Sequence, residues 1–431
     1  MRIAFLLHNA YGVGGTIRTT CNLAGALAAE HEVEVLSVFR SREVPAFAYD
    51  PRVRLRPLAD LRTEGPARLR DDPRAGRPAR VFPRGDRKYA EYSALTDDLI
   101  GACLAALDAD VVVGTRPGLN VHIARQAPRR IVRVAQEHLT FDTHSTRLTA
   151  TLRRRYPALD AVTTTTGADA AVYRRRMPGI RATGVPNCVP AAGDAVSDGS
   201  ARVVVAAGRL AEAKRYEDLV RAFATVAAAR PDWRLRLYGK GERRAALAAL
   251  IAELGLDRHV RLMGPAAPIE PELAKASVLA VTSSVESFGM TIVEGMRAGL
   301  PVVATDCPLG PREIVRDEVT GLLVPPRDVP AIAAALLRLI EDDERRKEMG
   351  RAALAAAAAY DPAVVAERHL RLYRELLAAR RRPAAGARAS VRATATRVAG
   401  SVLTALDAGG AARRAAVRKT RGKAGGRTAD R

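Results

Sequence analysis

The sequence predicts an α/β protein built from two doubly wound parallel sheets. Three observations favour this class. Short apolar runs alternate with longer stretches of helical period, the alternation stops at a segment rich in Gly, Ser and Asp over residues 190–200, and it then restarts. The length of 431 residues suits about two domains, and a hydrophobic content of 48% allows each a sizeable core and excludes a wholly disordered chain.

The first half opens with a buried strand at residues 3–7, a glycine-rich turn and a helix at residues 16–30. Further strands are expected at residues 33–38, 111–114, 131–135, 161–165 and 181–185. Residues 50–90 break the alternation, because their prolines and arginines follow no clear period. We interpret this segment as a long mobile loop, either a surface insertion or part of a binding site.

In the second half the same alternation returns and ends in a long helix. Strands are expected at residues 202–207, 234–238, 260–263, 278–282, 301–305 and 321–324, and helices at 215–229, 242–254, 294–298, 330–341 and 361–380. Two parallel sheets joined near residue 195 would face each other across a cleft. The carboxyl ends of their strands make that cleft the expected ligand site.

The charge of the chain is strongly positive and unevenly placed. The formal net charge is +22, from 69 Lys and Arg against 47 Asp and Glu. Nearly all the basic residues are arginine in an alanine-rich chain, which is typical of a GC-rich genome, and half of the net charge lies in residues 381–431. We therefore do not expect nucleic acid as the partner. This basic tail is expected to be disordered, with contact to an anionic membrane or another polyanion as the open alternatives.

The cysteine content and the lack of long apolar runs also indicate the cellular location of the protein. The four cysteines, Cys21, Cys103, Cys188 and Cys307, form no CxxC pair, which excludes a disulfide scaffold and fits a reducing cytoplasm. No run of about 18 uncharged apolar residues predicts a transmembrane helix, and the N-terminus lacks the features of a signal peptide. We expect a cytoplasmic protein, with peripheral contact at the inner face of the plasma membrane as an option for the tail.

The first glycine-rich turn has the character of an anion site. Gly14 and Gly15 follow a strand and precede a helix, so backbone N–H groups at the helix start can face a phosphate. The motif is not GxGxxG, and no acidic residue about 20 positions later fits a dinucleotide site. A tight structural turn explains these glycines equally well.

Two cations follow the first strand of the second half. Arg209 and Lys214 stand five residues apart where a parallel strand leaves the sheet, so both can point into the cleft. An arginine can bind a diphosphate with two parallel hydrogen bonds and a lysine as a point charge. A solvated pair on the surface is the alternative.

The most informative segment is residues 284–296, in which Glu286 and Glu294 stand eight apart across a loop-to-helix transition. Residues 287–290 would offer free backbone N–H groups at the helix start. Glu286 in the loop can accept hydrogen bonds from sugar hydroxyls. Glu294 is expected about two turns into the helix, within reach of a ribose.

Taken together, these motifs resemble family 4 of the retaining GT-B glycosyltransferases, also described as glycosyl transferases group 1. The resemblance rests on GRL-x3-K at residues 208–214, on ESFGMTIVE at 286–294 and on the later AGLPVVATD, GPREIV and GLLVPP segments, and it covers about residues 1–380. Two positions depart from the family pattern. Cys188 stands where a PNG turn has glycine, and Arg215 follows Lys214 where glycine is common.

The resemblance implies a role for each motif. Arg209 and Lys214 would neutralise the departing diphosphate, and Glu286 would bind donor-sugar hydroxyls near C3 and C4. His138, after a strand, would be the active-site histidine near that sugar, although a lone histidine is often structural. The remaining implied donor contacts are backbone N–H groups of Phe288, Gly289 and Met290 for the sugar, Glu294 for the ribose, Gly14 and Gly15 for the phosphates, Tyr238 and Gly239 for the base, and residues 310–313 for the sugar pocket.

The resemblance also implies the domain plan: GT-B, with two Rossmann-like doubly wound domains facing a cleft. Residues 1–190 would form the acceptor-side domain, 191–200 the linker, 201–360 the domain that binds the nucleotide-sugar, 361–380 a helix returning to the first domain, and 381–431 the tail. Positive side chains and helix dipoles would stabilise the leaving group. We therefore expect no cofactor and no metal, and we interpret Asp108-Ala109-Asp110 as structural although it is formally a DxD motif.

The predicted function is that of a retaining hexosyltransferase acting by front-face transfer. Its donor would be a nucleotide-sugar, a UDP-sugar by the family's commonest habit, and its acceptor a cell-envelope glycan, a lipid-linked acceptor or a small molecule. The alternative is a catalytically weak polyanion- or membrane-binding protein on a glycosyltransferase scaffold. The joint presence of Arg209, Lys214, Glu286 and Glu294 favours the enzyme, because a binding protein has little reason to keep all four.

Overall fold

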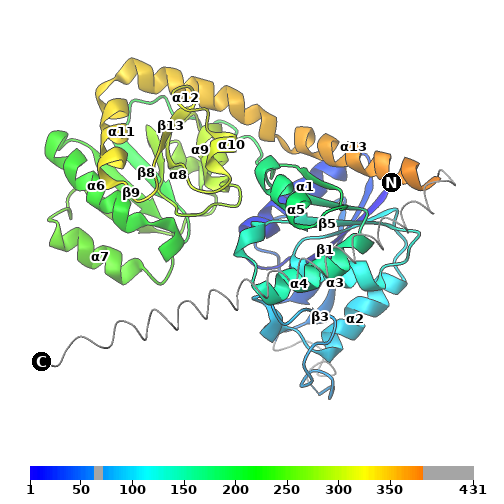
Figure 1. The fold of residues 1–431 in the computed structure, drawn as a ribbon. Coiled ribbons are helices and arrows are strands. Elements are labelled where there is room, and N and C mark those ends of the chain that lie inside the picture. Colours follow the sequence, from blue (N-terminus) through cyan, green and yellow to red (C-terminus); the bar gives the residue numbers. More distant parts are fainter. Residues whose placement is uncertain (63–70, 382–431) are drawn as a thin grey trace, which may run out of the picture.

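Two separate parallel sheets form the core of the protein (Figure 1). The computed structural model describes residues 1–62 and 71–381, so the predicted tail from residue 382 onward lies outside the described residues. The first sheet has the order β3-β2-β1-β4-β5-β6-β7 and the second β10-β9-β8-β11-β12-β13. Every neighbouring pair of strands in either sheet is parallel. The predicted fold class is thereby confirmed.

The strands and helices have the following bounds. The first sheet contains β1 (Arg2–Asn9), β2 (Glu32–Arg40), β3 (Val53–Asp60), β4 (Val111–Gly114), β5 (Val132–Glu137), β6 (Ala161–Thr164) and β7 (Ala182–Gly184). The second contains β8 (Val203–Ala207), β9 (Arg234–Tyr238), β10 (Val260–Gly264), β11 (Val278–Val281), β12 (Val302–Thr305) and β13 (Gly321–Val324). The helices with the first sheet are α1 (Gly15–Leu27), α2 (Ala94–Ala105), α3 (Pro117–Gln126), α4 (Thr146–Arg155) and α5 (Gly167–Arg176). Those that follow are α6 (Tyr216–Ala229), α7 (Arg244–Glu253), α8 (Glu270–Leu273), α9 (Met290–Arg297), α10 (Pro311–Ile314), α11 (Val329–Glu341), α12 (Asp343–Ala357) and α13 (Pro362–Arg381). Short 3-10 helices are η2 (Tyr89–Glu91), η3 (Phe141–Thr143), η4 (Tyr156–Ala158), η5 (Glu212–Lys214) and η6 (Ala358–Tyr360).

Continuous apolar strands form these sheets because helices cover both faces. In β4 and β11 every residue is buried, which is the pattern of a parallel sheet between two helical layers. Polar caps begin several of the helices: the Ser145 side chain accepts from the backbone N–H of Leu148 at the start of α4, and Asp328 does the same for α11. For α11 the capped start at Val329 agrees with the predicted start at residue 330 to within one residue.

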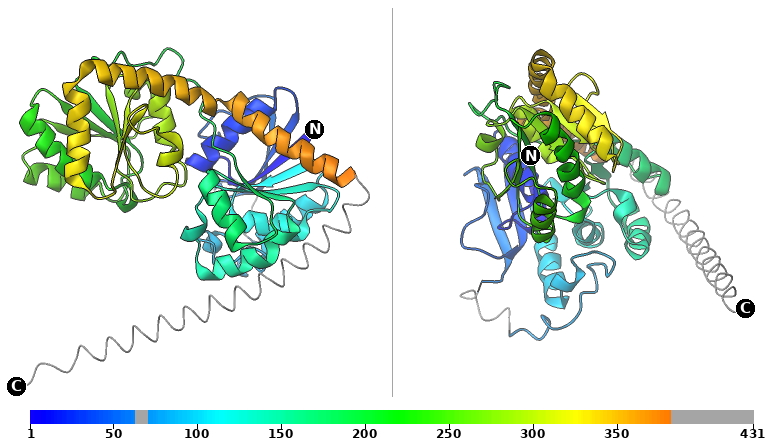
Figure 2. Two further views of the ribbon diagram at one scale, coloured as in Figure 1. Left: turned by 45° about the horizontal axis from the view of Figure 1, so that its top comes forward. Right: turned by 90° about the vertical axis from the view of Figure 1, so that its left-hand side faces the viewer.

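The final helix joins the two domains. α12 packs against α9 of the second domain, and α13 packs against α1 of the first. Val365, Leu370 and Tyr373 of α13 are buried in the same apolar cluster as Leu23 of α1. Figure 2 shows this pair of helices running along the molecule from one sheet to the other. The chain therefore crosses between the two domains a second time at this point, and the apolar face of α13 is buried against the first domain.

The prediction of a mobile loop over residues 50–90 is wrong for most of that segment. Residues 53–60 form β3, paired in register with β2, although their alternation is interrupted by arginines that reach solvent at the sheet edge. The later part packs onto the domain, since the rings of Phe82 and Tyr92 stack at 3.5 Å between centroids and both are buried. Hydrophobic period alone does not predict residues 71–90, because they are mostly irregular backbone that a few aromatic contacts hold in place.

The helix boundary near the glutamate pair also differs from its prediction. α9 begins at Met290, four residues before the helix predicted at 294–298. Glu294 therefore lies about one turn into the helix, which is less deep than the two turns expected from the spacing of the glutamates. Gly289 precedes it with φ 108°, a left-handed conformation that favours glycine and ends the preceding loop abruptly. The first turn of α9 consequently starts directly beside the loop that carries Glu286.

Each sheet has one point where the strand order reverses direction. In the first sheet this point lies between β1 and β4, and in the second between β8 and β11. Ligands of open parallel sheets bind outside the carboxyl ends of the strands at such points. The loops that follow β1, β4, β8 and β11 are therefore the expected ligand-binding loops. Within the described ranges, none of the helices is long and apolar enough to cross a membrane.

Candidate functional site

The loop after β8 carries the two predicted cations to the reversal point of the second sheet. Arg209 is exposed, and among the described residues no hydrogen bond or ion pair engages its side chain. Lys214 ends η5 and is half-buried. The backbone of this loop is fixed from the neighbouring strand: a Cβ at Gly239 would lie 1.8 Å from the Gly208 carbonyl oxygen, and Gly239 has φ 147°. Glycine at position 239 therefore lets the Gly208 carbonyl approach the backbone that follows β9, and this contact fixes the conformation of the β8 loop.

Lys214 meets Glu286 from the loop after β11. The Lys214 ammonium donates to Glu286 Oε1, which also accepts from the Ser283 hydroxyl at 2.7 Å. The Glu286 backbone is held on both sides, since its N–H donates to the carbonyl of Pro308 at 3.0 Å and its carbonyl accepts from Leu309 and Gly310. The structure therefore places a fixed carboxylate against a fixed ammonium at the reversal point.

Next to this pair lies the N-terminal end of α9. Phe288 is buried, and its ring contacts the ring of Tyr360 edge to face with 5.7 Å between centroids. That contact fixes the chain just before Gly289 and Met290, where the first N–H groups of α9 have no intrahelical acceptor. The electropositive end of the helix dipole adds to the positive charge of Lys214. The arrangement can hold a sugar hydroxyl or a phosphate oxygen.

Glu294 is the buried carboxylate of the site. Its side chain is 8% exposed, and its Oε1 accepts from Arg18 of α1 at 2.8 Å, while Arg18 also pairs with Glu270 of α8. Burial raises the pKa of Glu294, and Arg18 opposes that shift. Arg18 belongs to the first domain, so this ion pair closes the cleft across the two domains. Neither Arg18 nor Glu270 was predicted; the position of Arg18 three residues after Gly15 is the only signal in the sequence.

Gly14 and Gly15 face this arrangement from the first domain. A Cβ on Gly15 would meet no atom within 4 Å, and one on Gly14 would meet only the end of Ile17 at 4.0 Å. Internal packing therefore does not require either glycine. Both residues are exposed at the start of α1, two turns or less from Arg18. The open space in front of them is compatible with the close approach of a phosphate.

His138 follows β5 and lies apart from the ion pairs. Both of its ring nitrogens are shielded from solvent and lack a hydrogen-bond partner among the described residues. Burial lowers the pKa of His138 to about 4, and the nearby Asn187 side chain only weakly favours the protonated ring. The imidazole is therefore neutral at pH 7. Buried nitrogens without a partner are uncommon in folded proteins, which marks His138 as a candidate ligand contact.

Two residues predicted to contact the donor, Tyr238 and Glu313, form hydrogen bonds inside the protein. Tyr238 ends β9 and donates its hydroxyl to Glu272 at 2.6 Å. Glu313 accepts from the backbone N–H groups of Gly167 and Ala168, at 2.8 and 2.7 Å, and so caps α5 of the first domain. Residues 310–313 thus serve the domain interface, and the Glu313 carboxylate is already occupied. The Tyr238 ring remains buried beneath the β9 loop.

The two departures from the family pattern have local explanations. Arg215 adopts φ 52° and ψ 38°, the left-handed conformation that glycine adopts most readily, and its guanidinium forms two 2.9 Å bonds to Asp218. Cys188 is fully buried in the first-domain core. Asp108 and Asp110 both pair with Arg2 at the opposite edge of the sheet from the cleft. No group of three or more potential metal ligands occurs in the described ranges 1–62 and 71–381.

A second polar cluster of the first domain was not predicted at all. Glu137, at the end of β5, is fully buried and accepts from Asn120 at 2.8 Å and from the Tyr156 hydroxyl. Its other oxygen lies 3.9 Å from His144 Nε2. Burial raises the pKa of Glu137 to about 8 and lowers that of His144 to about 4. No local sequence pattern indicates this cluster, because its members come from four separate elements.

The raised pKa of Glu137 predicts a pH-dependent stability. Folded Glu137 keeps a proton that the unfolded chain releases above pH 4.5, so the free energy of unfolding falls as pH rises from about 4.5 to 8. The contribution is roughly 1 kcal/mol per pH unit. In urea unfolding at pH 5.5 and 7.5, Glu137→Gln should lose less stability than the wild type over that interval. The exposed Glu30→Gln should behave like the wild type, and an equal pH dependence in all three proteins would contradict the protonated state.

Comparison with known proteins agrees with this architecture. A family model described as Glycosyl transferases group 1 matches residues 194–355, the part that carries Arg209, Lys214, Glu286 and Glu294. A Streptomyces coelicolor protein named exopolysaccharide phosphotransferase is 34% identical over 89% of this chain and 42% of its own length. A D-inositol 3-phosphate glycosyltransferase of Corynebacterium urealyticum is 33% identical over 56% of this chain and 54% of its length. The chain thus spans about half the length of these curated relatives.

A solved structure covers nearly all of the described chain. The crystal structure of HepE from Anabaena in complex with UDP superposes with a TM-score of 0.67 at 18% identity and covers 87% of this chain and 100% of that one. At this identity the likeness shows the fold alone. The two facing parallel sheets define a GT-B protein. Over residues 194–355 the chain matches the model of the glycosyl transferases group 1.

Proposed function

We propose that this protein is a retaining glycosyltransferase that transfers a hexose from a UDP-sugar to a phosphorylated or glycan acceptor of the cell envelope. The observation that supports the proposal is the Lys214–Glu286 ion pair between the loops after β8 and β11, at the reversal point of the second sheet. Arg209 belongs to the same β8 loop, and Glu294 belongs to α9, which follows the β11 loop. Two cations, two carboxylates and a helix N-terminus at one place suit a molecule that has both a diphosphate and sugar hydroxyls. The UDP in the complex with HepE supports the choice of nucleotide.

In this proposal the chain's own charges supply the catalysis. Arg209 and Lys214 take up the negative charge that develops on the leaving diphosphate, and the N–H groups at the start of α9 add a fixed dipole. Donor binding exchanges the Lys214–Glu286 pair for contacts of Lys214 with phosphate and of Glu286 with sugar hydroxyls. Glu294 accepts from the ribose hydroxyls. His138, neutral at pH 7, lies on the first-domain side, where it can accept a hydrogen bond from the donor sugar.

The stereochemical part of the proposal is front-face transfer. The bond from the anomeric carbon to the diphosphate oxygen breaks, the acceptor oxygen bonds to the same face, and the acceptor's proton passes to the departing phosphate. No divalent cation is needed, because side-chain cations and the helix dipole neutralise the diphosphate. We place the reaction at the cytoplasmic side of the membrane.

Nucleotide release from a panel of UDP-, GDP- and ADP-hexoses in the presence of EDTA tests the proposal. We expect turnover with at least one UDP-hexose, no loss of activity on chelation, and retention of the anomeric configuration in the product by NMR. Turnover restored only by Mg²⁺ or Mn²⁺ would contradict the metal-free mechanism. Failure of every nucleotide-sugar to bind would contradict the function itself.

A further inference from the structure

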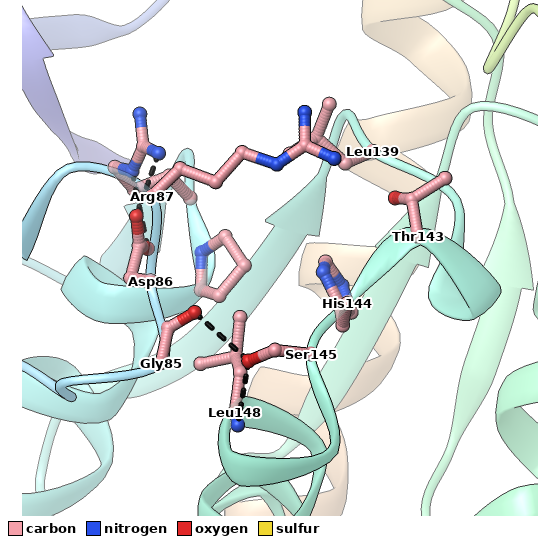
Figure 3. A pocket seen from close by; sticks show the side chains of 10 residues that line it. Gly85, Asp86, Arg87, Leu139, Thr143, His144, Ser145 and Leu148 are labelled. Carbon is pink, nitrogen blue, oxygen red and sulfur yellow. Dashed lines mark hydrogen bonds and ion pairs between the residues drawn. The ribbon is translucent and has the colours of Figure 1, made fainter.

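A separate pocket lies in the first domain, at the carboxyl ends of β4 and β5. Its volume is about 230 Å³, and Figure 3 shows its lining. Complete small-molecule sites occupy about 300–1,000 Å³, so this pocket is sized for one end of a ligand. It is lined by Gly85, Asp86, Arg87, Arg116, Pro117, Leu139, Thr143, His144, Ser145 and Leu148.

Two arginines and one aspartate set the charge of the pocket. Asp86 is buried and accepts from Arg116 at 2.8 and 3.3 Å and from the backbone N–H groups of Lys88 and Gly118 at 2.9 and 3.1 Å. These bonds use the acceptor capacity of Asp86 and fix the Arg116 guanidinium. Arg87 is exposed, and no ion pair or hydrogen bond engages its side chain within the described ranges. Figure 3 shows Arg87 extending over the pocket toward Leu139 and Thr143.

Two helices begin at the same pocket. α3 starts at Pro117 and α4 follows its cap Ser145, whose hydroxyl donates to the Gly85 carbonyl at 3.0 Å and thereby ties the loop of Asp86 to the α4 start. Each helix N-terminus contributes about half a positive charge. Asp86 is matched by Arg116, so Arg87 and the two helix N-termini give the lining about two positive charges in excess, close in size to the charge of a phosphomonoester at pH 7. Asp142, outside the lining, offsets part of this charge.

The floor of the pocket adds no opposing charge. The side chain of His144 is 2% exposed, with Nε2 3.1 Å from the Tyr173 hydroxyl. Burial lowers the pKa of His144 to about 4, so the ring is neutral. Behind it, Glu137 holds a proton at pH 7. Leu139, 37% exposed, and Pro117 provide an apolar rim for the part of the ligand that carries the charged group.

The pocket is also placed for the second substrate of the proposed reaction. Leu139 directly follows His138, and the β4 loop with Arg116 flanks the reversal point of the first sheet. The donor residues Arg209, Lys214 and Glu286 belong to the other domain. We propose that this pocket binds the phosphate of a phosphorylated acceptor, with Arg87 as its principal cationic contact. The inference rests on the proposed function and names the acceptor class.

Binding of phosphorylated probes to the full-length protein saturated with UDP tests this inference. UDP fills the donor site, so a phosphate group cannot bind Arg209 and Lys214 instead. The probes are glucose 1-phosphate against methyl glucoside, and farnesyl phosphate in detergent micelles against farnesol. Wild type should bind at least one phosphorylated probe about tenfold or more tightly than its uncharged partner. A preference confined to the sugar pair indicates a soluble acceptor, and one confined to the lipid pair a lipid-linked acceptor.

Substitutions then locate the binding. Arg87→Ala should lower affinity for the preferred phosphorylated probe about tenfold and leave UDP affinity unchanged, and Arg87→Lys should recover part of the loss. The matched control is Arg125→Ala, an exposed arginine at the far end of α3, which should bind as wild type does. Equal binding by the Arg87→Ala protein, or no preference for either phosphorylated probe, would overturn the inference. If the wild-type protein does not bind UDP, that result would instead contradict the proposed function.

Discussion

Replacing Lys214 by alanine should lower the turnover of the donor by about 100- to 1,000-fold, the effect of removing one preorganised group from a developing anion. Lys214 is the half-buried cation at the reversal point of the second sheet, and its ammonium already meets the Glu286 carboxylate there. The loss should fall mainly on kcat, because charge on the leaving diphosphate develops in the transition state. Steady-state release of UDP from the active UDP-hexose measures it.

The control for this substitution is a cation of the same domain that faces solvent. Arg221 on α6 is exposed, and Arg221→Ala should leave kcat within about twofold of wild type. Lys214→Arg keeps the charge but not the geometry, so partial activity is expected. If the Lys214→Ala protein has a normal melting temperature and turns over the donor within threefold of the wild-type rate, Lys214 is not a catalytic residue.

Replacing Glu294 by alanine should erase the protein's ability to distinguish a ribose from a deoxygenated ribose. Glu294 is 8% exposed, and its Oε1 accepts from Arg18 at 2.8 Å. Hydrogen bonds to a charged group contribute about 1.5–3 kcal/mol, so wild type should bind UDP roughly 10- to 100-fold more tightly than 2′,3′-dideoxy-UDP. In Glu294→Ala that ratio should approach one. Isothermal titration of both nucleotides on both proteins gives the coupling directly.

Two features distinguish the loss of the ribose contact in Glu294→Ala from a rearrangement of the two domains. Arg18 keeps its pair with Glu270 in the Glu294→Ala protein, which limits rearrangement across the domains. Glu294→Gln retains an acceptor oxygen and should keep part of the preference for ribose. An unchanged ratio in Glu294→Ala would assign the ribose to another residue.

The fold was predictable because its strands carry a simple signal. Buried strands such as β4 and β11 are uninterrupted apolar runs, and each is followed by a helix of clear period. β3 escaped prediction because it is an edge strand with Arg54 and Arg56 among its residues, and both pair with Glu34 of β2. That pairing links positions about 20 residues apart and cannot be seen in a local window.

The candidate site was predictable in part for a similar reason. The motifs around Lys214 and Glu286 are short local segments, and the strand order brings them together at one edge of the sheet. The role of Arg18 depends on how one domain faces the other, and local patterns do not specify that. The pocket around Arg87 was missed because its residues come from loops after different strands and from a segment without period.

A crystal structure of the 431-residue chain with UDP tests the central claim most directly. We expect the diphosphate between Gly14–Gly15 and the cations Arg209 and Lys214, with the ribose hydroxyls within hydrogen-bond distance of Glu294 and the Arg18–Glu294 pair opened or shared. UDP bound elsewhere, for example with its phosphates on Arg87 and Arg116 in the first domain, would contradict the assignment of the donor site.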